Sequence, residues 1–262
     1  MADDKEPVLL RETADGIATL TLNRPQQRNA LSMALMGELN AALAEIANDN
    51  DANVVVIRGN GPGFCAGHDL KEMRADHREE AHHRTLQECA RLMTAIVELP
   101  KPVIARVHGI ATAAGCQLVA TCDLAIAADN ARFATPGVNI GLFCSTPMVA
   151  LSRNVGRKQA MEMLLTGEMI DAATAVEYGL INRAVSPDEL DDAVQDLAAT
   201  ICSKSPMVLE IGKVAFYKQL ECSLAEAYEY TGAVMVRNMM TNDAAEGIDA
   251  FIEKRRPVWT GS

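Results

Sequence analysis

The clearest chemical signal in the sequence is a turn of small residues at positions 108–118, which reads His-Gly-Ile-Ala-Thr-Ala-Ala-Gly-Cys-Gln-Leu. A short apolar strand is expected before it, over 103–107, and an apolar helix after it, over roughly 114–122. Small side chains let a ligand approach the backbone closely. The amides at a helix N-terminus lack partners within the helix and suit an anionic oxygen. The stretch therefore predicts backbone donors aimed at a ligand, with Gln117 one turn further on.

Two other side chains could take part in chemistry at such a site. His68 is a possible acid or base near neutral pH; the alternative is that only its backbone N–H matters. Cys144 has no visible histidine partner, so a nucleophilic role is the less favoured interpretation.

Other patterns favour structural interpretations. Gly61-x-Gly63-x-x-Ala66 is similar to a dinucleotide fingerprint, but the expected acidic residue would fall in a helical region, so NAD binding is the least favoured hypothesis. His77, His82 and His83 lie in a polar helix without i,i+4 pairing, which favours a solvated face over a metal site. The basic run 254–256 is typical of a charged helix end, or could bind a phosphorylated ligand.

Strands and helices alternate in the first half of the sequence. Strands are expected over 8–10 and 17–22, joined at Asp15-Gly16. Ser32 is expected to cap a helix that runs to about Asn48, and a short strand over 54–57 follows. Asp69 opens one long polar helical region that reaches about Leu99.

The second half of the sequence is mostly helical. Strands are expected over 123–127 and 131–135, with a further short strand over 180–184, and Gly167 and Gly179 are expected to end helices. Four capping patterns predict further helix starts; they begin at Ser186, Ser205, Ser223 and Asp243. This order predicts an α/β core, at residues 1–200, followed by a helical region at residues 201–262.

Composition limits the classes of function. The 262 residues are 49% apolar but only 4% aromatic, and carry a formal charge of −11. This charge argues against non-specific binding of nucleic acid or anionic membranes. Seven dispersed cysteines without C-x-x-C spacing indicate free thiols, and the acidic N-terminus (residues 1–6) does not resemble a signal peptide. We expect from these features a soluble, cytoplasmic protein with no metal site.

Several motifs occur in the order and at the spacing typical of one family. They are Asn29-Ala30-Leu31, Gly67-His68-Asp69-Leu70-Lys71-Glu72, the turn at 108–118, Phe133-x-x-Pro136 and Phe251-Ile252-Glu253-Lys254-Arg255. Together they resemble the enoyl-CoA hydratase/isomerase (crotonase) family over nearly the whole chain. The resemblance implies a spiral of β-β-α units with a C-terminal helical trimerisation region, packed as a trimer or a dimer of trimers.

The resemblance also implies a binding site for an acyl-CoA thioester, with no cofactor beyond the coenzyme A moiety itself. The thioester oxygen is expected between the backbone N–H groups of His68 and Ala114. Residues implied in contacts with coenzyme A are Arg28, Ala30, Ala66, His68, Asp69, Leu70, Lys71, Phe251 and Lys254. Those implied around the acyl group are Leu142, Phe143 and Cys144.

The sequence departs from the family pattern where hydratases carry two glutamates. Gln117 and Gly137 occupy those positions, and neither side chain exchanges a proton near neutral pH. General acid–base catalysis typically contributes about 10²–10⁴-fold, so ordinary hydration is not expected. Open alternatives are decarboxylation, thioester hydrolysis, slow hydration of an unusual enoyl-CoA, or non-catalytic acyl-CoA binding.

Overall fold

The computed structural model describes residues 6–262, so most of the acidic N-terminal segment lies outside the described residues. The main sheet has six strands in the order β1-β2-β3-β4-β6-β9, and a second sheet has the order β5-β7-β8. The strands are β1 (Leu9–Ala14), β2 (Ile17–Leu22), β3 (Val54–Gly59), β4 (Val103–Val107), β5 (Ile110–Thr112), β6 (Leu124–Ala128), β7 (Arg132–Ala134), β8 (Ile170–Asp171) and β9 (Arg183–Val185). Only β1–β2 and β7–β8 pair antiparallel among these strands.

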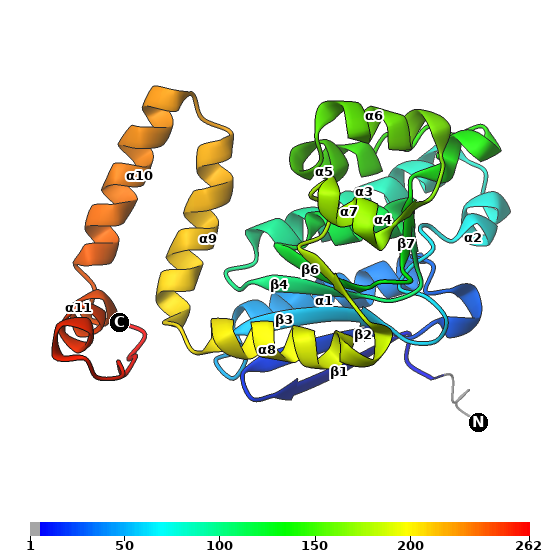
Figure 1. The fold of residues 1–262 in the computed structure, drawn as a ribbon. Helices are drawn as coiled ribbons and strands as arrows, with labels where there is room; N and C mark the ends of the chain where they lie inside the picture. Colours follow the sequence, from blue (N-terminus) through cyan, green and yellow to red (C-terminus); the bar gives the residue numbers. More distant parts are fainter. Residues whose placement is uncertain (1–5) are drawn as a thin grey trace.

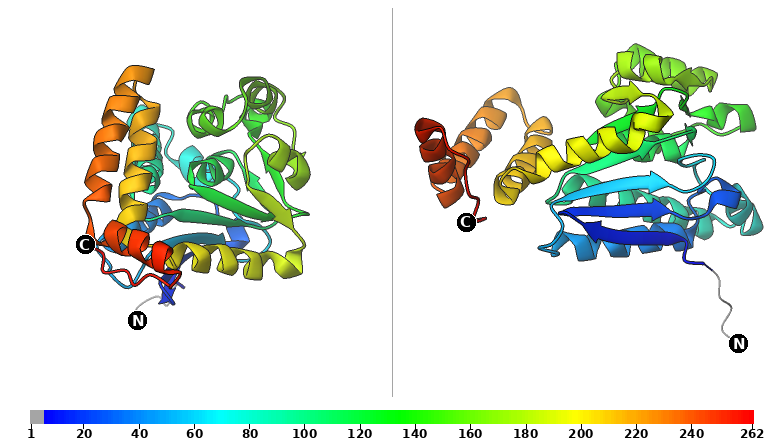
Figure 2. Two further views of the ribbon diagram at one scale, coloured as in Figure 1. Left: turned by 60° about the vertical axis from the view of Figure 1, so that its left-hand side comes forward. Right: turned by 60° about the horizontal axis from the view of Figure 1, so that its bottom comes forward.

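Eleven α-helices occur in the described part of the chain. They are α1 (Met33–Ala47), α2 (Leu70–Ala75), α3 (Glu79–Glu98), α4 (Ala114–Thr121), α5 (Pro147–Asn154), α6 (Arg157–Thr166), α7 (Ala172–Glu177), α8 (Leu190–Cys202), α9 (Pro206–Leu220), α10 (Leu224–Met239) and α11 (Asn242–Glu253). Figures 1 and 2 show α9, α10 and α11 standing to one side of the sheet and its covering helices. The expected α/β architecture with a C-terminal helical region is confirmed, whereas a boundary at residue 200 stays a prediction.

Both faces of the main sheet are covered, which explains why its parallel strands are nearly continuous apolar runs. Val55 and Ile57 of β3 belong to the larger core cluster, shared with α1 and α3. Val54 and Val56, which alternate with them, belong to a second cluster shared with α8. The sheet is therefore a central layer that fixes where each strand end emerges.

A buried ion pair attaches α9 to the core. The Nζ of Lys213 donates to Asp123 Oδ2 at 2.7 Å and to the carbonyl oxygens of Ile96 and Lys101 at 2.9 Å each. Tyr217 donates its hydroxyl to the other carboxylate oxygen of Asp123 at 2.8 Å. Asp123 directly follows Cys122, the C-cap of α4, so the C-terminal helices are anchored at one end of that helix.

Most expected elements are confirmed, including the hairpin at Asp15-Gly16 and the cap of α1 at Ser32. Three expectations are wrong. The helical region after Asp69 is broken at residues 76–78 into α2 and α3. The last helix is capped by Thr241 rather than by Asp243, which is buried and instead accepts from Ser205. Strands β5 and β8, of three and two residues, were not expected.

Candidate functional site

The turn before α4 is joined to a distant segment by backbone hydrogen bonds. Cys65 donates its N–H to Ile110 at 3.1 Å, and Thr112 donates its N–H back to Cys65 at 3.0 Å. The Thr112 hydroxyl adds a bond to the carbonyl of Ala66 at 3.1 Å. Gly115 packs against the same strand segment, because a Cβ there would overlap the carbonyl oxygen of Cys65. These contacts place residues 65–68 beside the N-terminus of α4.

The two predicted donors lie on these adjoining segments. Gly67, at φ +94°, is so close to the turn that a Cβ there would lie 3.3 Å from the backbone nitrogen of Ala114. Within residues 6–262, the amide nitrogens of His68 and Ala114 donate no hydrogen bond to the protein. Their neighbours are paired: Asp69 donates to Leu31 at 3.0 Å, and Ala113 donates to Ala134 at 2.9 Å. Two unpaired backbone donors therefore flank one junction.

Ala113 has a backbone conformation that side-chain-bearing residues rarely adopt, with φ 51° and ψ −118°. Such strain persists only where the surroundings enforce it, and it concentrates at functional sites. Here the hydrogen bond to Ala134 and the packing of Gly67 against the Ala113 methyl group hold it in place.

The Asn29-Ala30-Leu31 motif has a structural role. The Asn29 side chain is fully buried and donates to the carbonyls of Asn60 and Gly63 at 2.9 Å each, while accepting from the Arg24 amide. Arg28 and Asn29 both adopt left-handed backbone angles, with φ 49° and 55°. Leu31 then forms a parallel bridge with His68. The motif therefore sets the position of the first donor.

Asp69 positions the site rather than presenting a free carboxylate to a ligand. Its side chain pairs with Arg24 at 2.8 Å and caps α2 by accepting from the amides of Lys71 and Glu72. These partners hold the pKa of the carboxyl below its usual range, despite the opposing effect of burial. The carboxylate is thus engaged within the chain, and the interpretation of Asp69 as a coenzyme A contact stays a prediction. Leu70 is half-exposed on α2, whereas Ala30 is buried and its carbonyl accepts from Arg24, the partner of Asp69.

His68 is partly buried, and both of its ring nitrogens are inaccessible to solvent and have no hydrogen-bond partner among the described residues. Burial lowers the pKa of this side chain, so the ring is neutral at physiological pH. A neutral imidazole can both donate and accept a hydrogen bond.

Gln117 and Gly137 differ in what surrounds them. Gln117 is buried, and its Oε1 has a weak contact with the Cys89 thiol at 4.0 Å. A Cβ at Gly137 would lie 2.9 Å from both the Cys144 Sγ and the Leu142 carbonyl oxygen. Cys144 is buried, which raises the pKa of its thiol, whereas Leu142 and Phe143 are half-exposed. Of the three predicted acyl-pocket residues, Cys144 thus packs against residue 137 through its side chain, and Leu142 does so through its backbone.

Phe251 and Lys254 are not brought to this site within one chain. Phe251 lies on α11 and is 85% exposed, and Lys254 is the left-handed C-cap of the same helix. Figure 1 shows α11 and α2 at opposite sides of the molecule. The chain does not bring Phe251 and Lys254 to its own site, and their contact with coenzyme A stays a prediction.

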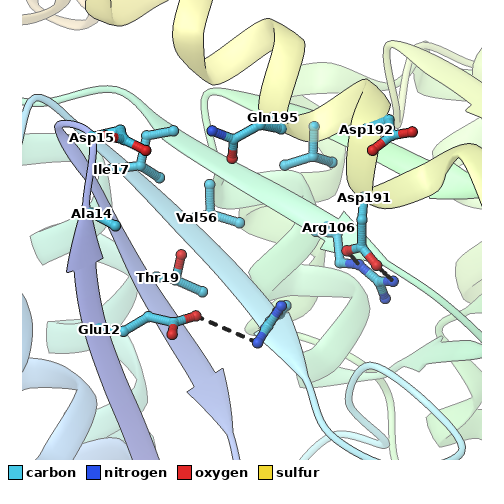
Figure 3. Close-up of a pocket in the computed structure, with 12 residues that line it drawn as sticks. Glu12, Ala14, Asp15, Ile17, Thr19, Val56, Arg106, Asp191, Asp192 and Gln195 are labelled. Carbon is cyan, nitrogen blue, oxygen red and sulfur yellow. Dashed lines mark hydrogen bonds and ion pairs between the residues drawn. The ribbon is translucent and has the colours of Figure 1, made fainter.

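An open pocket lies elsewhere, between β1–β3 and α8 (Figure 3). Its charged side chains are largely paired: Arg106 with Asp191 at 2.8 Å, and Arg58 with Glu12 at 3.5 Å. A neighbouring pocket includes His108, whose Nε2 lies 2.8 Å from the Gly61 carbonyl and whose Nδ1 lies 3.1 Å from Arg106. None of the residues predicted from the sequence to bind or react lines either pocket.

Residues 6–262 contain neither a candidate membrane span nor a candidate metal site. No helix in this range is both long and apolar enough to cross a membrane. The same range holds no group of three or more histidine, cysteine or acidic side chains placed to bind a metal ion.

Comparison with known proteins gives consistent matches over nearly the full length. The family model for enoyl-CoA hydratase/isomerase matches residues 12–262. A Xenopus laevis relative, the mitochondrial enoyl-CoA hydratase domain-containing protein 3, is 48% identical over 98% of this chain and 87% of its own length. The crystal structure of an enoyl-CoA hydratase from Mycobacterium smegmatis has a TM-score of 0.95 at 53% identity, covering 97% of this chain and 99% of the other. The crystal structure of human enoyl-CoA hydratase domain-containing protein 3 has a TM-score of 0.94 at 47% identity, and the match covers 96% of this chain and 100% of the human one.

The expected cytoplasmic location is wrong in light of these relatives. The proteins from Xenopus laevis, Rattus norvegicus and Homo sapiens, each 48% identical, are all named mitochondrial. Cysteine usage and the charge of the N-terminus do not distinguish these reducing compartments. By its family match, its relatives and its fold, this chain belongs to the enoyl-CoA hydratase/isomerase family.

Proposed function

We propose that the protein binds acyl-CoA thioesters and holds the thioester oxygen between the N–H groups of His68 and Ala114. The observation that carries this proposal is that the His68 and Ala114 amides both lack a hydrogen-bond partner among the described residues. The two amides lie on segments that backbone hydrogen bonds hold together beside α4. Preorganised donors of this kind stabilise the charge that builds on a thioester oxygen, each by about 3–4 kcal/mol in a water-excluded site. The strained Ala113 and the anchored Asn29 loop keep both donors fixed before a ligand arrives.

The proposed chemistry rests on oxyanion stabilisation without a carboxylate pair. Gln117 can orient water or substrate but not transfer a proton, and Gly137 is occluded by Cys144. Efficient hydration is therefore not expected, since each missing acid or base typically costs about 10²–10⁴-fold. Decarboxylation, thioester hydrolysis and slow hydration remain compatible with this arrangement.

Non-catalytic acyl-CoA binding is the second candidate function. It is favoured by the packing around Gly137, because the loop closes over the position from which a second catalytic group would act. Binding of several acyl-CoA thioesters without turnover of any of them would select it over an enzyme.

We also propose a homotrimer or a dimer of trimers. Large apolar side chains are exposed on α10 and α11, which an assembly would bury; they include Leu224, Tyr228, Met235, Val236, Met239, Met240, Ile248, Phe251 and Ile252. In such an assembly Phe251 and Lys254 of one copy could approach the coenzyme A of another, with Lys254 pairing with its phosphates. Sedimentation velocity tests this assembly directly, and a monomer at micromolar concentration would overturn it.

The decisive experiment compares butyryl-CoA with its thioether analogue, which has the same chain but no carbonyl oxygen. Calorimetry should show at least tenfold tighter binding of the thioester, because only the thioester offers an acceptor to the two amides. Equal affinities would contradict the oxyanion site. Incubation with crotonyl-CoA should show no hydration at ordinary hydratase rates.

A further inference from the structure

Four buried side-chain polar atoms within residues 6–262 have no hydrogen-bond partner. One, the Asn40 Oδ1, belongs to α1, whose Asn40 amide bonds to Glu88 of α3. The other three are both ring nitrogens of His68 and the hydroxyl oxygen of Thr135. Buried polar groups are normally paired, so orphaned atoms call for an explanation.

The His68 imidazole belongs to the same residue as the first proposed donor and lies on the core side of its segment. Parallel bridge partners project their side chains to the same face, and the bridge partner of His68 is Leu31, which is 1% exposed. The ring therefore lies toward the core, on the face of the segment that Leu31 shares.

Thr135 lies on a second segment that contacts the turn before α4. It follows Ala134, whose carbonyl accepts from Ala113 at 2.9 Å and which pairs with Thr112 in the small sheet. Thr135 is 1% exposed. The orphaned groups thus stand on the two segments that flank the N-terminus of α4, one on each.

The polar groups gathered here are uncharged. His68 is neutral, Thr135 carries a hydroxyl, and the nearby Gln117 carries an amide whose Oε1 has only the weak thiol contact. A plain hydrocarbon chain would leave these groups unpaired. A site built to hydrogen-bond a substrate group discriminates strongly against analogues that lack the group.

We propose that His68 and Thr135 are specificity-determining residues that select acyl-CoA thioesters whose acyl group carries an uncharged hydrogen-bonding substituent, a hydroxyl or keto group near the thioester carbon. This inference rests on the proposed function, because it requires acyl-CoA to bind at the two amides. It adds what kind of acyl group the interior accepts.

Calorimetry with four ligands tests the inference: butyryl-CoA, 3-hydroxybutyryl-CoA, acetoacetyl-CoA and succinyl-CoA. We expect the hydroxy or keto ligand to bind at least tenfold more tightly than butyryl-CoA, and succinyl-CoA to bind no better than butyryl-CoA. His68→Phe and the near-isosteric Thr135→Val should each reduce the preference, and the double variant should bring it within twofold. Asn40→Ala, which removes the orphaned atom between α1 and α3, should leave the preference unchanged.

The failures of the two proposals are distinguishable. Binding of butyryl-CoA with no preference for the polar ligands, or a preference that survives in both variants, overturns this inference alone. Tighter binding of succinyl-CoA overturns the requirement for an uncharged substituent. Absence of binding by any acyl-CoA overturns the proposed function and this inference together. Circular dichroism of each variant establishes that it is folded before its affinities are compared.

Discussion

A Cβ atom added to Gly137 would lie 2.9 Å from the Sγ atom of Cys144. The same Cβ would lie 2.9 Å from the Leu142 carbonyl oxygen, in a loop closed by the bond from the Leu142 amide to Gly137. The space that a side chain at residue 137 would need is therefore already occupied by atoms of Cys144 and Leu142. Restoring a carboxylate there requires more than one substitution.

Gly137→Glu, alone or with Gln117→Glu, should not produce an efficient hydratase. Gly137→Ala should lower the free energy of unfolding by about 1–3 kcal/mol through overpacking, and Cys144→Ala in the same chain should recover part of that loss. Urea unfolding of the two single variants and the double variant measures this coupling. Gly212→Ala on α9, where a Cβ meets nothing within 4 Å, is the matched control. Full stability of Gly137→Ala would contradict the packing argument.

Gly115→Ala should damage stability and ligand binding together. Its Cβ would overlap the Cys65 carbonyl, so the junction beside α4 would have to open. We expect a loss of at least about 1–3 kcal/mol in unfolding free energy and weaker binding of butyryl-CoA. Gly37→Ala in α1, where the added Cβ is unhindered, should instead be neutral or stabilising by up to about 1 kcal/mol. If the two variants behave alike, close packing of Gly115 is not important.

Lys213→Met should be strongly destabilising, because it leaves the Asp123 carboxylate in a largely buried setting without its charge partner. Breaking a buried pair in this way costs about 3–5 kcal/mol. Arg153→Met, which removes an exposed pair with Glu221, should cost less than about 1 kcal/mol. Chemical unfolding of both variants under one set of conditions makes the comparison; a smaller effect at Lys213 than at Arg153 would be the contrary result.

Stability should fall as the pH drops below about 6.5, the ordinary pKa of histidine. Burial lowers the folded-state pKa of both His68 and His108. The unfolded chain therefore takes up protons near pH 6.5 that the folded chain accepts only at lower pH, so the stabilisation is complete above that pH and is lost below it. A proton added to His108 would also be repelled by the charge of Arg106, which lies 3.1 Å from Nδ1.

Urea unfolding at pH 8, 6.5 and 5 measures this dependence. His108→Gln and His68→Phe should each flatten it between pH 6.5 and 5. An unchanged slope in both buried-site variants would show that other groups cause the pH dependence.

The local signals of the sequence were sufficient for most elements. Asp15-Gly16, Ser32 and Ser223 each specify their turn or cap through neighbouring residues, and each does so in the structure. Asp243 also carries a capping pattern, but Ser205, Thr260 and Gly261 recruit its carboxylate. These partners lie far from it in sequence or beyond the helix, and so the helix begins at another cap.

The candidate site was predictable in its backbone and less so in its side chains. Small residues and helix starts indicate the turn before α4 and the start of α2, whereas the choice of His68 and Ala114 as a donor pair comes from the family resemblance. The structure places the two segments side by side. Thr135 was missed because a threonine before a proline carries no distinctive signal, and only the full fold leaves its hydroxyl without a partner. Cys144 occupies the space beside Gly137 only because the loop folds back on itself, and the spacing of residues in the sequence does not predict that fold.

Helix α4 has the proposed ligand donor at its first residue and the anchor of α9, Asp123, just beyond its C-cap. Any ligand that restrains Ala114 and any subunit contact that restrains α9 would thus act on opposite ends of one buried eight-residue rod. Thermodynamic linkage then requires reciprocity: if assembly tightens ligand affinity, the ligand must tighten assembly by the same factor.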